Sequence, residues 1–286
     1  MNEYFGGWYF KSQSKIQTLA VIVAGHIHEG KPSASIQIIN DEGAWNIPFA
    51  AEEYHVEQDG FTTSVGENKF GEDGLTLSIQ TQDFCATGAL TFGKLTPVAY
   101  DIMGPFRFIP FMECRHAVKS LWHSVDGSVT VNGVEYRFDG DNGYIEGDRG
   151  RSFPSEYLWT HCNFGEEGHD SLMLSVANIP FGLFHFTGLL CTIWHGGKEY
   201  RLATYLGART TYIGNNTAVV RQGDEELIVK LIEKKAHPLY APANGAMTRT
   251  IRESASCRAF YRFRKGGKTL FSFVSDRASF EYEYQK

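Results

Sequence analysis

Residues 129–138 have the sequence Val-Thr-Val-Asn-Gly-Val-Glu-Tyr-Arg-Phe, which carries the clearest structural signal in the chain. Asn132-Gly133 supplies the two positive φ angles of a type I′ turn, and residues suited to strands flank it on both sides. The segment therefore predicts a β-hairpin. A second hairpin is predicted over 261–274, around the turn Lys265-Gly-Gly-Lys268.

Strand patterns also dominate outside the two hairpins. Apolar and polar residues alternate over 33–39, 75–79 and 280–284, which predicts strands with one face inward and the other toward water. No long segment has a 3.6-residue period, although a short helix near 48–54 fits the sequence. These patterns predict an all-β fold.

The two halves of the chain are faintly alike at an offset of about 150 residues. Trp8-Tyr-Phe before Leu19-Ala-Val-Ile is echoed by Tyr157-Leu-Trp before Leu172-Met-Leu-Ser-Val. We expect two tandem lipocalin-like β-barrels, or curved antiparallel sheets, packed together. The expected domains are 1–148 and 149–286, with the junction within 143–154, and a barrel of this kind can enclose one small apolar ligand.

Bulk composition narrows the class of protein. Aromatic residues make up 14% of the 286 residues, and the net charge is -6, which disfavours nucleic acid as a partner. The sequence has neither a signal-peptide pattern nor an apolar run long enough for a membrane span, and its five cysteines are scattered. We expect a cytoplasmic protein with reduced thiols. Peripheral membrane contact and the oligomeric state stay open.

Residues 143–163 combine charged and aromatic side chains, Gly-Tyr-Ile-Glu-Gly-Asp-Arg-Gly-Arg-Ser-Phe-Pro-Ser-Glu-Tyr-Leu-Trp-Thr-His-Cys-Asn. Such a group can form a polar cluster at the mouth of an apolar pocket. It can equally be an interdomain linker held by ordinary ion pairs.

The segment resembles the tocopherol cyclase signature Tyr-x-Glu-x-Asp-Trp-Gly-x-x-Phe-Pro, which precedes an aromatic-rich strand ending in Asn. Similarity to that family extends along the chain in the same motif order. The further motifs are Tyr4-Phe-Gly-Gly-Trp-Tyr-Phe-Lys, Ile102-Met-Gly-Pro, Pro110-Phe-Met-Glu-Cys-Arg-His, Ser171-Leu-Met-Leu-Ser-Val-Ala, Arg201-Leu-Ala-Thr-Tyr, Leu239-Tyr-Ala-Pro and Met247-Thr-Arg-Thr-Ile-Arg-Glu. Arg149 stands where the family usually has Trp, His161 where Gln is frequent, and Gly6 where an acidic residue is common. These departures would alter substrate choice or the reaction if they line the site.

The resemblance implies cyclisation of a prenylated hydroquinone to a chromanol. This reaction is an isomerisation, so it implies neither a redox cofactor nor a metal. It requires an acid that protonates an alkene, aromatic faces that stabilise the cation, and a dry cavity. We expect the catalytic groups to be Glu146 and Asp148 as acids, with His161 and His116 as partners of the phenol. The expected substrate-binding residues are Trp8, Tyr144, Arg149, Phe153, Trp159 and Asn163.

Each assignment has a structural alternative. Glu146 and Asp148 fit a salt-bridge cluster with Arg149 and Arg151, and any one aromatic residue or histidine fits core packing. His26 and His28 share a strand face as metal ligands do, but the sequence offers no third ligand. At the level of function, a non-catalytic carrier for a prenylquinone, carotenoid or other lipid is the main alternative to an enzyme. A structural protein with a closed pocket is a further one.

Overall fold

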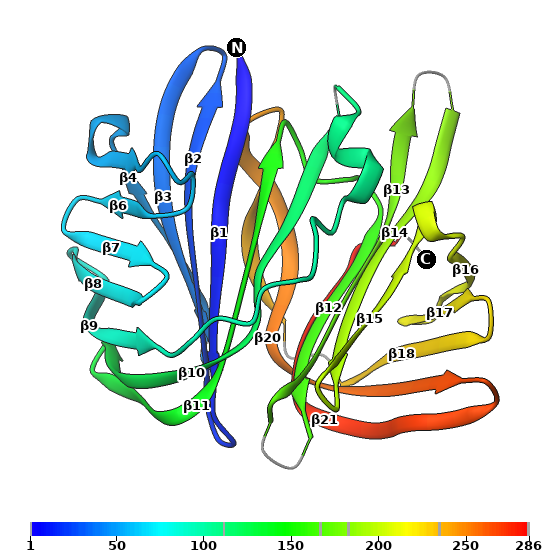
Figure 1. Ribbon diagram of the computed structural model, residues 1–286. Helices are drawn as coiled ribbons and strands as arrows, with labels where there is room; N and C mark the ends of the chain where they lie inside the picture. Colours follow the sequence, from blue (N-terminus) through cyan, green and yellow to red (C-terminus); the bar gives the residue numbers. More distant parts are fainter. Residues whose placement is uncertain (1, 111, 166–167, 182–183, 234–235, 285–286) are drawn as a thin grey trace. The chain divides into compact units, whose positions relative to one another are not determined.

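The computed structural model describes the whole chain except residues 1, 111, 166–167, 182–183, 234–235 and 285–286. In the described residues, all long elements are β-strands, and they form two antiparallel sheets of 11 and 10 strands (Figure 1). The predicted all-β class with two large antiparallel sheets is confirmed. The only helical segments among these residues are three short 3-10 turns, η1 (Ala51–Glu53), η2 (Gly104–Phe108) and η3 (Thr204–Leu206). The first of them falls within the predicted short helix.

The first sheet has the order β4-β3-β2-β1-β11-β10-β9-β8-β7-β6-β5. Its strands are β1 (Glu3–Gln13), β2 (Thr18–His28), β3 (Lys31–Asn40), β4 (Ala44–Phe49), β5 (Tyr54–Val56), β6 (Thr63–Val65), β7 (Asn68–Gly71), β8 (Gly74–Gln80), β9 (Cys85–Phe92), β10 (Cys114–Val131) and β11 (Val134–Gly150). The turn between β10 and β11 has φ angles of 48° at Asn132 and 84° at Gly133. The predicted hairpin at 129–138 is therefore confirmed.

The second sheet has the order β15-β14-β13-β12-β21-β20-β18-β17-β16, with β19 paired to β20. Its strands are β12 (Tyr157–Phe164), β13 (Asp170–Phe181), β14 (Phe184–His195), β15 (Lys198–Ala203), β16 (Arg209–Gly214), β17 (Thr217–Gln222), β18 (Glu225–Glu233), β19 (His237–Ala243), β20 (Ala246–Lys265) and β21 (Lys268–Tyr282). The hairpin predicted over 261–274 joins β20 to β21. In each sheet, a four-strand meander pairs through its first strand with a late strand, β11 or β21, which is consistent with the internal repeat.

Contacts between residues divide the chain into two compact units. Unit 1 consists of Met1–Pro97, Val118–Ser152 and Tyr240–Arg249, and unit 2 consists of Val98–Ala117, Phe153–Leu239 and Thr250–Lys286. Each unit has its own hydrophobic cluster. Phe10, Val21 and Ile145 belong to the cluster of unit 1, and Leu158, Leu174 and Phe280 belong to that of unit 2.

Strand β8 shows the simple alternation that its sequence predicts. Leu75, Leu77 and Ile79 are at most 3% exposed, while Thr76 and Ser78 between them are exposed. One face of this strand therefore packs into the core and the other meets water.

Strand β3 departs from that pattern. Ser35, Gln37 and Ile39, which the alternation directs toward water, are at most 4% exposed. The prediction of a water-facing side is wrong here because residues 240–249 of the same unit reach this face. The amide of Gln37 donates to the carbonyl of Tyr240 and accepts from its N–H, both at 3.1 Å.

The predicted water-facing side of 280–284 is also wrong at Glu281. Its side chain is buried, with 8% exposure, and accepts a hydrogen bond from the hydroxyl of Tyr157. Charged side chains are rarely buried without a partner, and Tyr157 supplies one.

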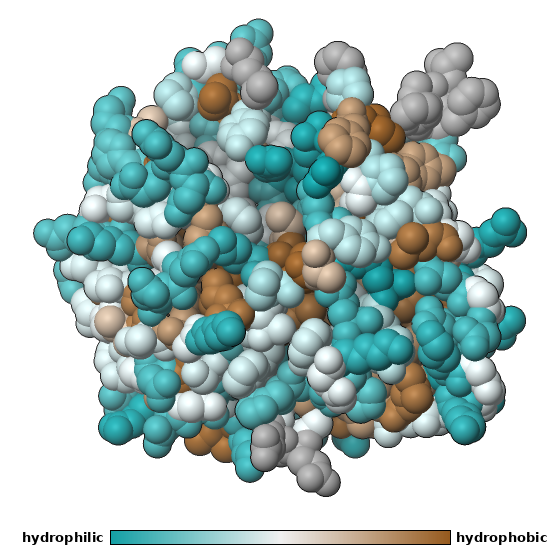
Figure 2. Space-filling view, in the orientation of Figure 1, coloured by the Kyte–Doolittle hydropathy of each residue, from teal (hydrophilic) through white to brown (hydrophobic). Residues whose placement is uncertain are grey.

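The molecular face drawn in Figure 2 is mostly teal and white, with hydrophobic residues in separate brown patches. The most exposed large hydrophobic side chains of the described residues are Ile16 and Phe108, at 78% and 73%. Among these residues, none of the helical segments has the length and hydropathy to cross a bilayer.

Candidate functional site

Three candidate residues of unit 1 lie on the sheet face opposite to the hydrophobic cluster. Because side chains alternate along β11, Tyr144, Glu146 and Asp148 share one face, and Ile145 points to the core on the other. Tyr144 and Glu146 are 0% and 5% exposed, and Asp148 is partly buried. The sequence leads us to expect these groups in a hollow enclosed by the strands. The core face instead carries packed apolar side chains.

Tyr144 and Glu146 form the best-defined contact of this face. The Tyr144 hydroxyl donates to Oε2 of Glu146 at 2.7 Å. Burial, followed by the charge of Glu146 and this hydrogen bond, raises the pKa of Tyr144 well above its usual value. The phenol therefore stays a neutral donor at physiological pH and orients the Glu146 carboxyl.

Strand β1 adds a residue that the sequence analysis missed. Lys11 is only 1% exposed and lies directly opposite Tyr144 in the ladder, while Tyr9 lies opposite Glu146. Directly opposed residues in an antiparallel pair point to the same face, and the diagonal neighbour of Lys11 on β11 is Glu146. A buried ammonium is costly without polar partners, so Lys11 adds a second polar group to this buried face. The only sequence signal was a lysine within an aromatic strand.

Arg149 and Trp8 do not share this face with Glu146. Arg149 is exposed, and alternation directs it to the other side of β11. Trp8 lies opposite Gly147 and packs against the core, with its ring 4.8 Å from that of Phe61 in an edge-on arrangement. Its indole N–H donates to the carbonyl of Gly60 at 3.3 Å.

Strand β12 of unit 2 repeats the arrangement. Leu158 and Cys162 point into the core, and the alternate residues occupy the opposite face. Those residues are all buried, at 5% exposure for Tyr157, 6% for Trp159, 0% for His161 and 6% for Asn163. His161 contacts the hydroxyl of Ser171 through Nε2 at 3.3 Å. The motif thus places His161, Trp159 and Asn163 together on one face of β12.

Two buried carboxyl groups join this face, and the sequence analysis assigned neither. Glu281 lies opposite Trp159 on one side and opposite Glu253 on the other. Glu253 is 1% exposed. The two residues are therefore buried as direct cross-strand neighbours, and like charges in such a pair destabilise the sheet. Such a pair is a candidate proton donor.

Three further residues singled out from the sequence are His116, Phe153 and His26. His116 lies near the start of β10, is partly buried and belongs to unit 2. Phe153 is also partly buried and packs edge-on against Tyr157, with ring centroids 6.1 Å apart. His26 contacts the hydroxyl of Ser35 at 2.9 Å.

No protein-family model matches the chain, and no curated protein matches it. Solved structures do match over nearly its whole length. CghA, crystallised with the compound Sch210972, has a TM-score of 0.60 at 11% identity, and the alignment covers 99% of this chain and 89% of CghA. Kievitone hydratase from Nectria haematococca has a TM-score of 0.52 at 12% identity, with 98% and 89% covered.

A third similar structure is a candidate AttH protein from Nitrosomonas europaea, with a TM-score of 0.52 at 11% identity and coverage of 99% and 92%. Sequence identity this low carries the likeness of fold alone. The chain therefore shares the all-β, two-sheet fold of CghA, kievitone hydratase and the AttH-like protein.

Proposed function

We propose that the protein is a tocopherol cyclase-like enzyme, which closes a prenylated hydroquinone or a similar apolar substrate into a chromanol-type product by acid catalysis. The observation that carries the proposal is the buried Glu146 carboxyl, oriented by the Tyr144 hydroxyl at 2.7 Å. Both residues belong to the segment that resembles the family signature. The fold is shared with an enzyme named as a hydratase. Hydration and the proposed ring closure both break an O–H bond and add its oxygen and a hydrogen to the two carbons of a double bond.

The proposed reaction needs one proton and returns one. An acid, for which Glu146 and Asp148 are the candidates, protonates the trisubstituted alkene at its less substituted carbon, leaving a tertiary cation. The phenol oxygen then forms the new C–O bond and loses its proton, which returns to the carboxylate and regenerates the acid. The ring of Tyr144, on the same strand face as Glu146, would stabilise the cation. Because the net change is an isomerisation, the proposed steps consume no redox equivalent.

A carrier of an apolar molecule is the second candidate function. It is favoured by the fold shared with CghA, whose structure was solved with a small molecule. Binding requires apolar walls and one polar anchor, whereas the cyclase also requires the acid. Catalysis, not binding, therefore separates the two functions.

The test is incubation of the protein with a prenylated benzoquinol in D₂O, followed by chromatography and mass spectrometry. A cyclase should give a product that elutes differently and carries one non-exchangeable deuterium at the former alkene carbon. A carrier should quench tryptophan fluorescence on binding the benzoquinol but return it unchanged.

Substitution of the proposed acid makes the test specific. Glu146→Gln should lower turnover by about 100-fold or more while sparing substrate binding, because an amide cannot donate the proton. Glu135→Gln, at an exposed position of the same strand, is the matched control and should retain full activity. Product formation by Glu146→Gln at the wild-type rate would show that Glu146 is not the proton donor. Parallel Asp148→Asn, Glu253→Gln and Glu281→Gln variants would then identify the acid.

A further inference from the structure

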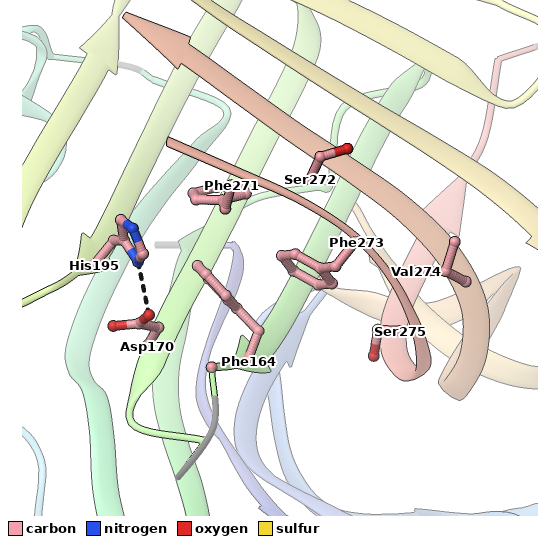
Figure 3. A pocket seen from close by; sticks show the side chains of 9 residues that line it. Phe164, Asp170, His195, Phe271, Ser272, Phe273, Val274 and Ser275 are labelled. Atoms are coloured by element: carbon pink, nitrogen blue, oxygen red, sulfur yellow. Dashed lines mark hydrogen bonds and ion pairs between the residues drawn. The ribbon is translucent and has the colours of Figure 1, made fainter. Parts of the chain in front are cut away.

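A solvent-facing hollow in unit 2 is distinct from the residues assigned to the cyclisation. It has a volume of about 610 Å³ and lies where the end of β12 meets β13, β14 and β21. Figure 3 shows Asp170 and His195 on one side, with the rings of Phe164, Phe271 and Phe273 beside them. A volume of this size suits a small organic ligand.

Asp170 holds the imidazole of His195 in one orientation. Oδ2 of Asp170 lies 2.7 Å from Nδ1 of His195, and Oδ1 accepts the backbone N–H of Gly196 at 3.1 Å. A carboxylate only accepts hydrogen bonds, so the ring hydrogen is on Nδ1. In the neutral ring, Nε2 is then a hydrogen-bond acceptor. The His195 side chain is 28% exposed, so a ligand can reach it.

The other wall of the hollow is aromatic. The ring of Phe164 stacks on that of Phe273 at 4.6 Å between centroids and lies 4.7 Å from that of Phe271. Phe271 also meets the imidazole of His195 edge-on, at 5.4 Å. A planar aromatic ligand can pack against these rings while a donor group on its edge reaches Nε2.

We infer that this hollow is a binding site for a hydroxylated aromatic molecule, whose phenol O–H donates to Nε2 of His195 while its ring packs on the phenylalanines. The imidazole acceptor selects the hydroxyl, and the three rings select the aromatic body. Asp170 acts as a positioning residue, because it sets which nitrogen of His195 accepts.

The inference is tested with two matched probes, 2-naphthol and 2-methoxynaphthalene, titrated into the full-length protein by calorimetry. The rings are the same, but only 2-naphthol can donate a hydrogen bond. The wild-type protein should bind 2-naphthol about tenfold more tightly, the ratio expected for one hydrogen bond. Equal affinity for the two probes would overturn the inference.

Substitutions at the lining residues then test whether 2-naphthol binds in the hollow. Asp170→Asn keeps the shape and the acceptor for Gly196, but its amide donates to Nδ1 and moves the ring hydrogen to Nε2. The preference for 2-naphthol should disappear in this variant. Phe273→Ala should weaken both probes, and His55→Leu, at an exposed histidine of unit 1, should change neither.

The outcome is separable from that of the proposed cyclisation. Glu146→Gln should bind 2-naphthol as the wild type does, since Glu146 is not one of the residues that line the hollow. Loss of 2-naphthol binding in Glu146→Gln, or an unchanged preference in Asp170→Asn, would show that the probe binds elsewhere and would overturn the inference. Failure to detect cyclisation would leave it standing.

Discussion

His26 shows how burial of a single titratable side chain links the fold to pH. Its ring is 5% exposed and contacts the hydroxyl of Ser35. Desolvation lowers the pKa of His26 to about 4, from the usual 6.5. His123 is fully buried, and desolvation lowers its pKa to about 3. Both rings are therefore neutral in the folded protein over a range where the unfolded chain binds protons.

The expected consequence is a loss of stability on acidification. Between pH 6.5 and about 4, the unfolded state binds the proton that folded His26 does not, so the free energy of unfolding falls as the pH falls. For His26 the loss is about 2 kcal/mol from pH 7 to pH 5. Urea unfolding gives the free energy of unfolding at pH 7 and at pH 5. The difference between the two values should be smaller in His26→Gln than in the wild type, but unchanged in His55→Gln, whose site is exposed. An unchanged pH dependence in His26→Gln would contradict the assignment.

The hairpin at residues 240–249 is the element that closes the second face of strands β2 and β3. Gln37 bonds to the backbone of Tyr240 in both directions, and the N–H of Gly245 donates to the carbonyl of Arg151 at 2.8 Å. Gly245 has φ of 75°, and a Cβ there would lie 1.9 Å from the carbonyl oxygen of Ile27. Only glycine fits this close approach.

Gly245→Ala should therefore destabilise the protein by more than the cost of placing alanine at a positive φ angle alone. We expect the free energy of unfolding to fall by about 3 kcal/mol or more. Alanine is strained at positive φ, and its Cβ would also force the backbone of Ile27 to move. Gly267→Ala is the matched control, since Gly267 has φ of 77° and open space around its Cβ position. It should cost about 1 kcal/mol. Equal midpoints of thermal unfolding for the two variants would show that the hairpin does not dock as described.

At the scale of the whole molecule, neither unit is one continuous stretch of chain. Unit 1 takes Tyr240–Arg249 from late in the sequence, and unit 2 takes Val98–Ala117 from the first half. The domain boundary expected from the sequence, between 148 and 149, stays a prediction. A fragment cut at that boundary provides a direct test of it.

The fragment 1–148 should fold less stably than the full chain. It lacks the 240–249 hairpin and Gly150, the ladder partner of Phe5, and it leaves the face around Gln37 exposed. Calorimetry should give it a lower midpoint and a smaller unfolding enthalpy than the corresponding transition of the intact protein. Addition of 149–152 alone should not restore it, because the hairpin is still missing. A fragment as stable as the full chain would support the expected boundary.

Local pattern was sufficient for the elements of this fold. The Asn132-Gly133 turn and the alternation of Leu75, Leu77 and Ile79 specify strands and hairpins through backbone preference and burial of one face, and neither needs distant residues. The signature segment likewise identified Tyr144, Glu146 and His161, which the structure places on buried faces.

Tertiary structure alone decided that both faces of the central strands are covered. Glu281 lies at a position where alternation predicts exposure, yet it is 8% exposed, and the charged residues Lys11 and Glu253 are each only 1% exposed. An alternating pattern records which face is more apolar, but burial of the other face depends on segments distant in sequence. Gln37 and Tyr240 are joined across about 200 residues, so no local window contains that information.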